Sequence, residues 1–306
     1  MSDDRDLLII DAHHHFWDLS MRAHPWLVAP PPIPFRYGDY SAICRDYLPV
    51  DYHRDSGAHN VVATVTMEGE WDEADPVAES RWMSTIAAAN LGFPAAHVAR
   101  AILHRADAED VIAAHAAFPL VRGIRHKPVA APAPDRIEAG CAGSMSDPAW
   151  RRGYAALARH GLHFELQAPW WHVDELIDLI AAHPAVPVVI NHAFLPADRS
   201  AEGLAGWRAA LRRAASAPQV AIKISGIGIK GKAWSLADNR PIIREIIEVF
   251  GPARAMFASN FPVDGLTGTF DTIYSGFKAA TADLDPAARR ALFSGTARRI
   301  YRLHAA

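Results

Sequence analysis

Eight short runs rich in valine, isoleucine and aromatic residues recur along the chain of 306 residues, and their spacing restricts its fold more than any other feature. Their centres lie roughly 25 to 55 residues apart, which is the separation that a strand–helix–strand unit needs. Several runs are apolar without alternation, as strands buried on both faces should be. The runs span residues 7–16, 60–68, 98–104, 121–126, 163–167, 187–192, 220–226 and 254–260.

Three intervals between the runs carry helix signals: an Asp or Asn that caps the first turn, a proline in that turn, and a glycine at the end. They predict helices from Asp75-Pro76 to near Gly92, from Asp147-Pro148 to near Gly161, and from Asn239, with Pro241 in the first turn, to Gly251. Alternating strands and helices predict one (β/α)8 (TIM) barrel domain over residues 1–306. A doubly wound open sheet is the alternative, although no Gly-rich phosphate turn follows the first run.

Residues 17–53 form an interval that is too long for a simple connection. It contains Pro30-Pro31-Pro32 and Pro34, which do not suit a regular element. Long insertions in compact domains are usually functional lids or binding loops. We therefore expect a proline-rich capping insertion over the mouth of the barrel, with short helices of its own.

Composition excludes several classes of partner. A formal net charge of −3, from 31 basic and 34 acidic side chains, leaves no positive surplus for a phosphate backbone, so nucleic acid is not expected. Residues 1–6 are acidic where a secretory signal would be basic, and no apolar run approaches the roughly 18 to 20 residues of a membrane span. The chain is expected to be cytoplasmic. Cys44 and Cys141 are too few for a disulfide scaffold and are expected to be inert thiols.

Histidines gather where the chemistry of a barrel lies, at the carboxyl ends of its strands. The first run ends Asp11-Ala12-His13-His14-His15, and a period of two sends Asp11, His13 and His15 to one face and His14 to the other. Two imidazoles so placed could chelate one divalent ion or hydrogen-bond one substrate oxyanion; a chance surface cluster is the alternative. His192 ends the sixth run and would face the same lumen.

Charged residues end other runs. Arg125 and His126 finish the fourth, and alternation allows only one of them to point inward. We favour Arg125, whose guanidinium could grip a substrate carboxylate, and expect His126 outside the lumen. The alternative is that Arg125 pairs with Glu68 or Glu165 to hold the barrel together. Glu68, at the end of the second run, is a candidate ligand, base or ion-pair partner.

The remaining polar and aromatic residues near the strand ends are assigned more modest roles. Glu165 is expected to be structural, and Lys223 is expected to extend to the rim, since an inward lysine would need an acidic partner or a lowered pKa. Trp17 and Trp171 follow the first and fifth runs and suit the apolar walls of a pocket for a ring-shaped ligand, with plain packing as the alternative.

Five motifs occur in order over nearly the whole chain: Ile-Asp-Ala-His-His-His-Phe-Trp-Asp (10–18), Arg-Gly-Ile-Arg (122–125), Ile-Asn-His (190–192), Lys-Ile-Ser-Gly (223–226) and Ser-Asn-Phe-Pro-Val (259–263). Together they resemble the amidohydrolase 2 family of metal-dependent hydrolase barrels. The likeness is to the branch that holds L-fuconolactonase, L-rhamnonolactonase and 2-pyrone-4,6-dicarboxylate lactonase.

The resemblance implies a reaction centre made by His13, His15 and His192. These would hold one divalent metal ion, zinc or else manganese, although some members work without metal and bind the substrate through histidine and arginine. The family places a water-activating aspartate at the end of strand eight, where this chain has Asn260. A carboxamide cannot accept the proton of water. Asp264, four residues on, is the expected replacement; otherwise a histidine or Glu68 serves as base.

The leading hypothesis is the hydrolysis of a small lactone or related cyclic ester in sugar or aromatic catabolism. Arg125 would anchor a carboxylate, and the substrate would be a carboxylated or hydroxylated ring. Because Asn260 replaces the usual base, two alternatives stand: non-oxidative decarboxylation of an aromatic acid on the same barrel, and a ligand-binding barrel without turnover. A homo-oligomer is compatible with each.

Overall fold

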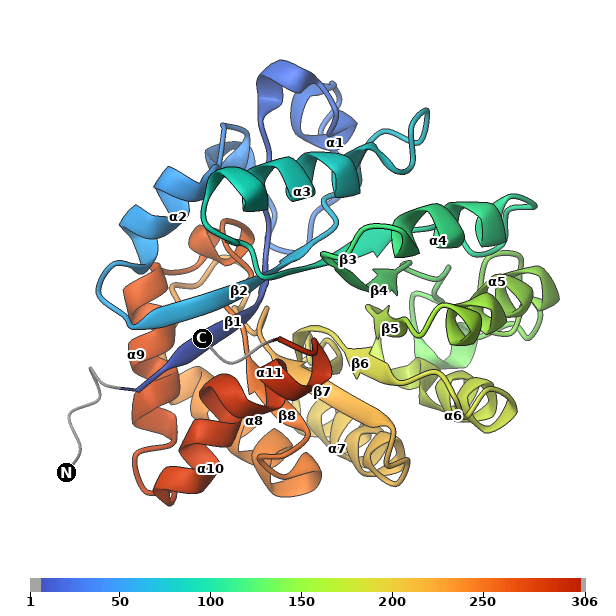
Figure 1. The fold of residues 1–306 in the computed structure, drawn as a ribbon. Helices are drawn as coiled ribbons and strands as arrows, with labels where there is room; N and C mark the ends of the chain where they lie inside the picture. Colours follow the sequence, from blue (N-terminus) through green and yellow to red (C-terminus); the bar gives the residue numbers. More distant parts are fainter. Residues whose placement is uncertain (1–6, 304–306) are drawn as a thin grey trace.

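The computed structural model describes residues 7–303, and within this range eight parallel strands form one sheet in the order β1 to β8 (Figure 1). Every strand pairs with the next strand in sequence. The ring is closed where the His15 N–H donates to the Phe261 carbonyl (2.8 Å) and the Asn260 N–H to the His13 carbonyl (2.7 Å). The (β/α)8 barrel expected from the sequence is confirmed. The acidic residues 1–6 lie outside the described range.

The element bounds follow the predicted runs closely, except that β3 begins and ends earlier than residues 98–104. The strands are β1 (Ile9–His14), β2 (Val61–Met67), β3 (Ala96–Arg100), β4 (Val121–Arg125), β5 (His163–Leu166), β6 (Val188–Ile190), β7 (Val220–Ile224) and β8 (Ala255–Phe257). The helices are α1 (Pro25–Val28), α2 (Pro49–Ser56), α3 (Ala78–Ala89), α4 (Ala108–Ala116), α5 (Pro148–Arg159), α6 (Val173–Ala182), α7 (Ala201–Ala215), α8 (Leu236–Phe250), α9 (Phe270–Ala280), α10 (Pro286–Arg290) and α11 (Thr296–Ile300).

Two apolar layers hold the barrel. The larger lies between the strands and the surrounding helices, and the smaller fills the inside of the ring with side chains such as Ile10, Val65 and Met256. Tyr301, directly after α11, belongs to the inner layer and is fully buried. Figure 1 shows α11 close to the centre of the ring of strands. The carboxyl-terminal helix therefore packs its aromatic end into the barrel interior.

The predicted helix starts are correct for α5 and wrong for α8. Asp147 caps α5 by accepting a hydrogen bond from the Ala149 N–H. Helix α8 begins at Leu236, because Ser235 has an extended backbone and its hydroxyl accepts a hydrogen bond from a first-turn N–H. Asn239 is consequently not the cap, and Pro241 lies inside the helix rather than in its first turn. Serine was the stronger capping signal in this interval.

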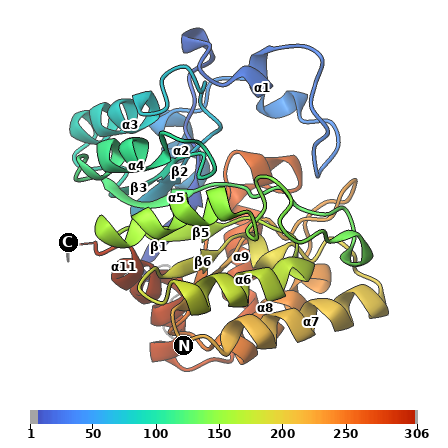
Figure 2. The ribbon, with the colours of Figure 1, turned by 90° about the vertical axis from the view of Figure 1, so that its right-hand side faces the viewer.

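The capping segment, residues 17–53, contains α1 and the start of α2, and it carries the short helices that its length suggested. Figure 2 shows the part around α1 at the top of the view, set apart from the outer helices. Its two ends are tied together, since Trp17 and Tyr47 exchange backbone hydrogen bonds of 3.0 and 2.9 Å. The Trp17 indole N–H also donates to the Arg45 carbonyl (2.8 Å). That residues 1–306 form a single domain stays a prediction.

Helix α5 packs so closely on the segment after β3 that Gly153 has no room for a side chain. A Cβ added there would lie 2.1 Å from the Leu103 carbonyl oxygen, which is backbone and cannot rotate away. We expect Gly153→Ala to lower the free energy of unfolding by about 1–3 kcal/mol, the usual cost of overpacking. Gly295→Ala is the matched control, because its Cβ would lie 3.5 Å from the nearest atom. Equal stability of the two variants in urea denaturation would contradict the close approach.

Among the described helices, none is both long and apolar enough to cross a membrane.

Candidate active site

A cavity of about 220 Å³ opens at the carboxyl ends of the strands, beneath the capping segment. Barrel residues and cap residues share its lining, so the insertion forms one wall of the site. The barrel and its loops contribute His15, Gly69, Glu70, Arg125, Lys127, Gln167, His192, Asn260 and Val263, and the capping segment contributes Trp17, Trp26, Ile33, Pro34, Phe35 and Arg36.

His13 and His15, at the end of β1, turn their rings toward each other, with their Nε2 atoms 3.3 Å apart. The His15 Nδ1 lies 3.0 Å from the Met67 carbonyl, so Nδ1 carries the proton and Nε2 the lone pair. Burial lowers the pKa of both imidazoles well below the usual range, which keeps them neutral. Two nitrogen ligands on a tetrahedral zinc ion, at roughly 2.0–2.1 Å from the metal, are about 3.3 Å apart. The pair therefore has the spacing of two metal ligands.

His192 lies beside this pair, with its ring centroid 4.6 Å from that of His13. Its Nδ1 is 3.0 Å from the Ser225 hydroxyl, and its backbone has a positive φ of 52°, which is uncommon outside glycine. The three predicted imidazoles are thus brought together. Within residues 7–303, however, no set of three or more His, Cys, Asp or Glu side chains is arranged to hold a metal ion. That His13, His15 and His192 together hold a metal ion therefore stays a prediction.

Asp11 does not share the lumen with these imidazoles, contrary to the period-two expectation. Its carboxylate accepts hydrogen bonds from the Ser259 hydroxyl (2.5 Å) and from the Tyr52 hydroxyl of α2 (2.7 Å), on the helix side of β1. The register of β1 against β2 is irregular between Asp11 and His14, which breaks the simple alternation. His14 packs on this same outer side, against the Tyr52 ring at 4.5 Å. It is therefore separated from His13 and His15, as expected, but not from Asp11.

Arg125 reaches the cavity but is already engaged by protein acceptors at all three guanidinium nitrogens. Its Nε donates to a Glu68 carboxylate oxygen (2.5 Å), Nη2 to the Glu68 carbonyl (2.6 Å) and Nη1 to the Gln167 side chain (3.1 Å). Burial alone would raise the pKa of Glu68, but the attraction of Arg125 and Lys127 prevails and lowers it to about 2. This is the buried ion pair that the sequence left as the alternative. A substrate contact for Arg125 or a catalytic role for Glu68 stays a prediction.

Asp264 reaches back to Asn260, as the sequence suggested, but it is buried behind that residue and does not line the cavity. Its Oδ1 accepts hydrogen bonds from Asn260 Nδ2 (2.7 Å), the Tyr37 hydroxyl (2.9 Å) and Arg36 Nη2 (3.3 Å), and its Oδ2 accepts one from the Gly226 N–H (2.9 Å). Burial raises the pKa of the Asp264 carboxyl. Both oxygens already face protein donors, so its role as the water-activating base stays a prediction.

This arrangement of strand-end residues on a (β/α)8 barrel agrees with the comparison to known proteins, in which the model of the family described as Amidohydrolase matches residues 10–303. The chain belongs to the amidohydrolase family.

Relatives of this amidohydrolase include an uncharacterized protein of Sinorhizobium fredii, 36% identical over 97% of this chain and 99% of that protein. An L-fucono-1,5-lactonase of Burkholderia multivorans is 28% identical over 97% of this chain and 96% of its own length. Among solved structures, an amidohydrolase from Burkholderia multivorans with bound zinc has a TM-score of 0.76 and 27% identity, covering 97% of this chain and 100% of its own.

Lys223 does not extend to the rim of the amidohydrolase barrel. It is completely buried, and its Nζ lies 2.7 Å from a Glu165 carboxylate oxygen. Burial lowers the pKa of Lys223 to about 8, against the attraction of Glu165. Lys223 therefore meets both conditions that an inward lysine requires: an acidic partner and a lowered pKa. Glu165 has the buried, paired environment expected of a structural carboxylate.

Other candidates divide between the cavity and its surroundings. Trp17 lines the cavity, whereas Trp171 is not one of the lining residues and donates its indole N–H to the Ala131 carbonyl (3.0 Å). His126 lies outside the lumen, where its Nδ1 accepts a hydrogen bond from the Trp150 indole (2.9 Å). The inward choice of Arg125 over His126 thus agrees with the structure of the amidohydrolase.

Sequence reasoning missed Arg36, a cap residue that lines the cavity. It lies in the proline-rich interval between Pro34 and Tyr37, where no strand periodicity assigns a direction to a side chain. Its main partner, Asp264, is 228 residues away along the chain. Only the folded amidohydrolase reveals this contact.

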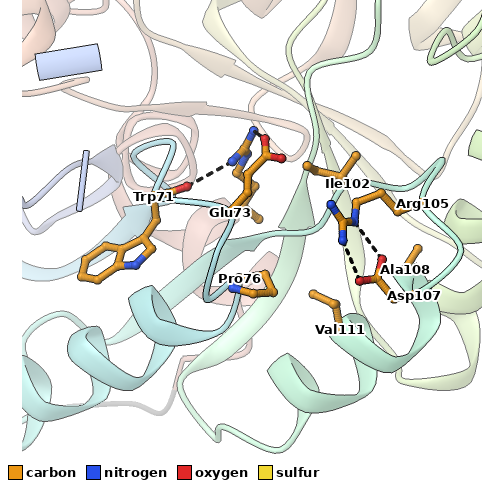
Figure 3. Close-up of a pocket in the computed structure, with 9 residues that line it drawn as sticks. Trp71, Glu73, Pro76, Ile102, Arg105, Asp107, Ala108 and Val111 are labelled. Carbon is orange, nitrogen blue, oxygen red and sulfur yellow. Dashed lines mark hydrogen bonds and ion pairs between the residues drawn. The ribbon is translucent and has the colours of Figure 1, made fainter. Parts of the chain in front are cut away.

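A second, smaller cleft of about 20 Å³ lies between the segment after β2 and the start of α4 (Figure 3). Its charged residues satisfy one another: Arg105 pairs with Asp107 (2.9 Å), and Arg100 pairs with Glu73 (2.9 Å). Figure 3 shows the Arg105 and Asp107 side chains turned toward each other rather than into open space. The histidine-lined cavity is therefore the candidate active site of this amidohydrolase.

Proposed function

We propose that this amidohydrolase hydrolyses a small lactone in the catabolism of a sugar or an aromatic compound. The observation that carries the proposal is the His13–His15 pair, with Nε2 atoms 3.3 Å apart, adjoining a cavity that His192 and Asn260 line. The L-fucono-1,5-lactonase relative supports a lactone as the substrate class. Hydrolysis of such an ester needs a polarised carbonyl, an oriented water and a proton acceptor.

His13 and His15 are the residues that would hold a divalent ion, zinc or manganese. When bound, such an ion polarises the carbonyl and lowers the pKa of water from 15.7 to about 7. The zinc in the related Burkholderia structure supports this assignment.

Asn260 and His192 would direct the attacking water. The Asn260 amide N–H₂ donates to Asp264, which leaves the amide oxygen as the acceptor that orients a water in the cavity. Burial, and then the nearby charge of Arg36, lower the pKa of His192 well below its usual range, so this ring is neutral and offers a lone pair. We assign to His192 the role of accepting the proton of the attacking water. Asp264 would act through Asn260, by fixing its orientation.

A lactone panel assayed by acid release tests the reaction, and elemental analysis of the protein purified without added metal tests the ion. We expect chelation to lower the rate and zinc or manganese to restore it, because His13 and His15 lose the cation that they are spaced to share. Full activity after complete metal removal would be consistent with lactone hydrolysis but would show that the reaction does not need a metal ion.

Two other outcomes point to the alternatives that Asn260 motivates. Release of carbon dioxide from dihydroxybenzoates, without acid from any lactone, would identify a decarboxylase. Thermal stabilisation by lactones without turnover would identify a ligand-binding barrel. Either result would overturn the proposed hydrolysis while leaving the family assignment intact.

A further inference from the structure

Arg36 places a positive charge from the capping segment at the cavity wall, and one of its guanidinium nitrogens has no acceptor among residues 7–303. Its Nη2 lies 3.3 Å from Asp264 Oδ1, a long contact that this oxygen shares with Asn260 and Tyr37. Its Nη1 is buried and has no hydrogen-bond partner among residues 7–303. A buried cationic donor without an acceptor costs free energy, so such a group calls for a ligand or ordered solvent.

The other cations of the cavity differ in this respect. All three guanidinium nitrogens of Arg125 have protein acceptors, chiefly Glu68. Lys127 forms an ion pair with Glu70, which also lines the cavity. Each of these charges is matched by a carboxylate of its own. Arg36 instead faces a carboxylate that already accepts two other hydrogen bonds on the same oxygen.

We propose that Arg36, rather than Arg125, binds a carboxylate of the substrate, which makes the preferred substrates lactones that carry an acid group. The inference rests on the proposed function of the site. A guanidinium presents two parallel N–H groups that match a carboxylate, and it binds best through N–H groups that no protein acceptor holds in another direction. Nη1 of Arg36 donates no hydrogen bond to the described protein, whereas every guanidinium nitrogen of Arg125 already donates one.

The surroundings of Arg36 hold it in place for this task. Its guanidinium carbon lies 4.6 Å from the centre of the Tyr37 ring, and the Tyr37 hydroxyl donates to Asp264. The Asp264 Oδ2 is in turn fixed by the Gly226 N–H after β7. Asp264 is thus a positioning residue that ties the capping segment to the barrel and orients one end of the guanidinium. The cap thereby contributes to substrate choice as well as covering the mouth.

Matched pairs of lactones test the proposal: the monolactone of glucaric acid, which carries a carboxylate, against gluconolactone, which has a neutral hydroxymethyl group instead. We expect Arg36→Met to raise KM for the acidic lactone by about 10- to 100-fold, the range of a hydrogen bond to a charged group. Any change in kcat, which would come from the charge that Arg36 places near His192, should be equal for the two lactones, and KM for the neutral lactone should change little. In Arg36→Lys the rise in KM should be smaller, because lysine keeps the positive charge but lacks the paired N–H groups of a guanidinium.

Arg45→Met is the matched control, since Arg45 is a cap arginine that does not line the cavity and pairs with Asp51 at 3.8 Å. It should behave as wild type on both lactones. An equal rise in KM for the acidic and the neutral lactone in Arg36→Met would overturn the proposal. Arg36 would then contact a group that both lactones have, or would stabilise the fold. A wild type that does not prefer the acidic lactone would also overturn the proposal.

Thermal stabilisation by the same two lactones separates this inference from the proposed function. Stabilisation of wild type by the acidic lactone, lost in Arg36→Met and accompanied by no turnover, would support Arg36 as the carboxylate site and reject lactone hydrolysis. Turnover without discrimination between the two lactones would reject the role of Arg36 alone. Neither stabilisation nor turnover would reject both.

Discussion

A His192→Gln variant is expected to lose about 10²- to 10⁴-fold in kcat for lactone hydrolysis, which is the usual contribution of a positioned general base. Glutamine fills a similar volume and can still hydrogen-bond the Ser225 hydroxyl, which lies 3.0 Å from His192 Nδ1. It cannot accept the proton of water. Because the proton transfer belongs to the chemical step, kcat and kcat/KM should fall together and KM should change little.

His126→Gln is the matched control for this substitution. His126 also follows a barrel strand, but it lies outside the lumen, against the Trp150 indole. Its variant should keep wild-type kcat, with both proteins showing native circular dichroism. Loss of a general base should leave at most about a hundredth of wild-type kcat. If His192→Gln retained more than about a tenth, His192 would not be the proton acceptor. Asp264→Asn would then be the next variant, because Asp264 reaches the cavity through Asn260.

The strands and most strand-end candidates could be predicted from the sequence because both depend on local patterns. A strand buried on both faces is apolar throughout, and the carboxyl ends of parallel barrel strands meet at one rim, so His13, His15 and His192 were expected together. The direction of each side chain was less predictable. Asp11 faces the helices because the register between β1 and β2 is irregular, and period-two reasoning assumes a regular strand.

What the sequence could not indicate depends on pairs far apart in the chain. Lys223 was expected at the rim because nothing in its own run points to Glu165, which is on β5 while Lys223 is on β7. Arg36 lies in an irregular segment, where no period assigns a direction to a side chain, and it meets Asp264 only after folding. Burial of a charge is a tertiary property, since the partner that makes it tolerable comes from another element.

A Lys223→Met variant is expected to lose about 3–5 kcal/mol of the free energy of unfolding, the cost of leaving a buried charge without its partner. Glu165 would be that charge, and it is completely buried inside the barrel. Burial raises its pKa, but Lys223 and His163 outweigh this effect and hold it at about 2, so Glu165 is ionised in the native protein. Its remaining partners are the Asn191 side-chain amide, the Tyr301 hydroxyl (2.5 Å) and His163 Nε2 (3.1 Å), and none of them supplies a fixed positive charge.

The double variant Lys223→Met, Glu165→Gln separates the missing charge partner from lost packing. Without the carboxylate, the methionine no longer faces an uncompensated charge, and we expect the double variant to be more stable than Lys223→Met alone. Urea denaturation followed by both fluorescence and circular dichroism measures the difference, provided that the two transitions coincide. If the double variant were less stable than the single one, the Lys223 ammonium would not be required to compensate Glu165. The loss in Lys223→Met would then come from packing around the Tyr301 ring, which lies 5.3 Å from Lys223 Nζ.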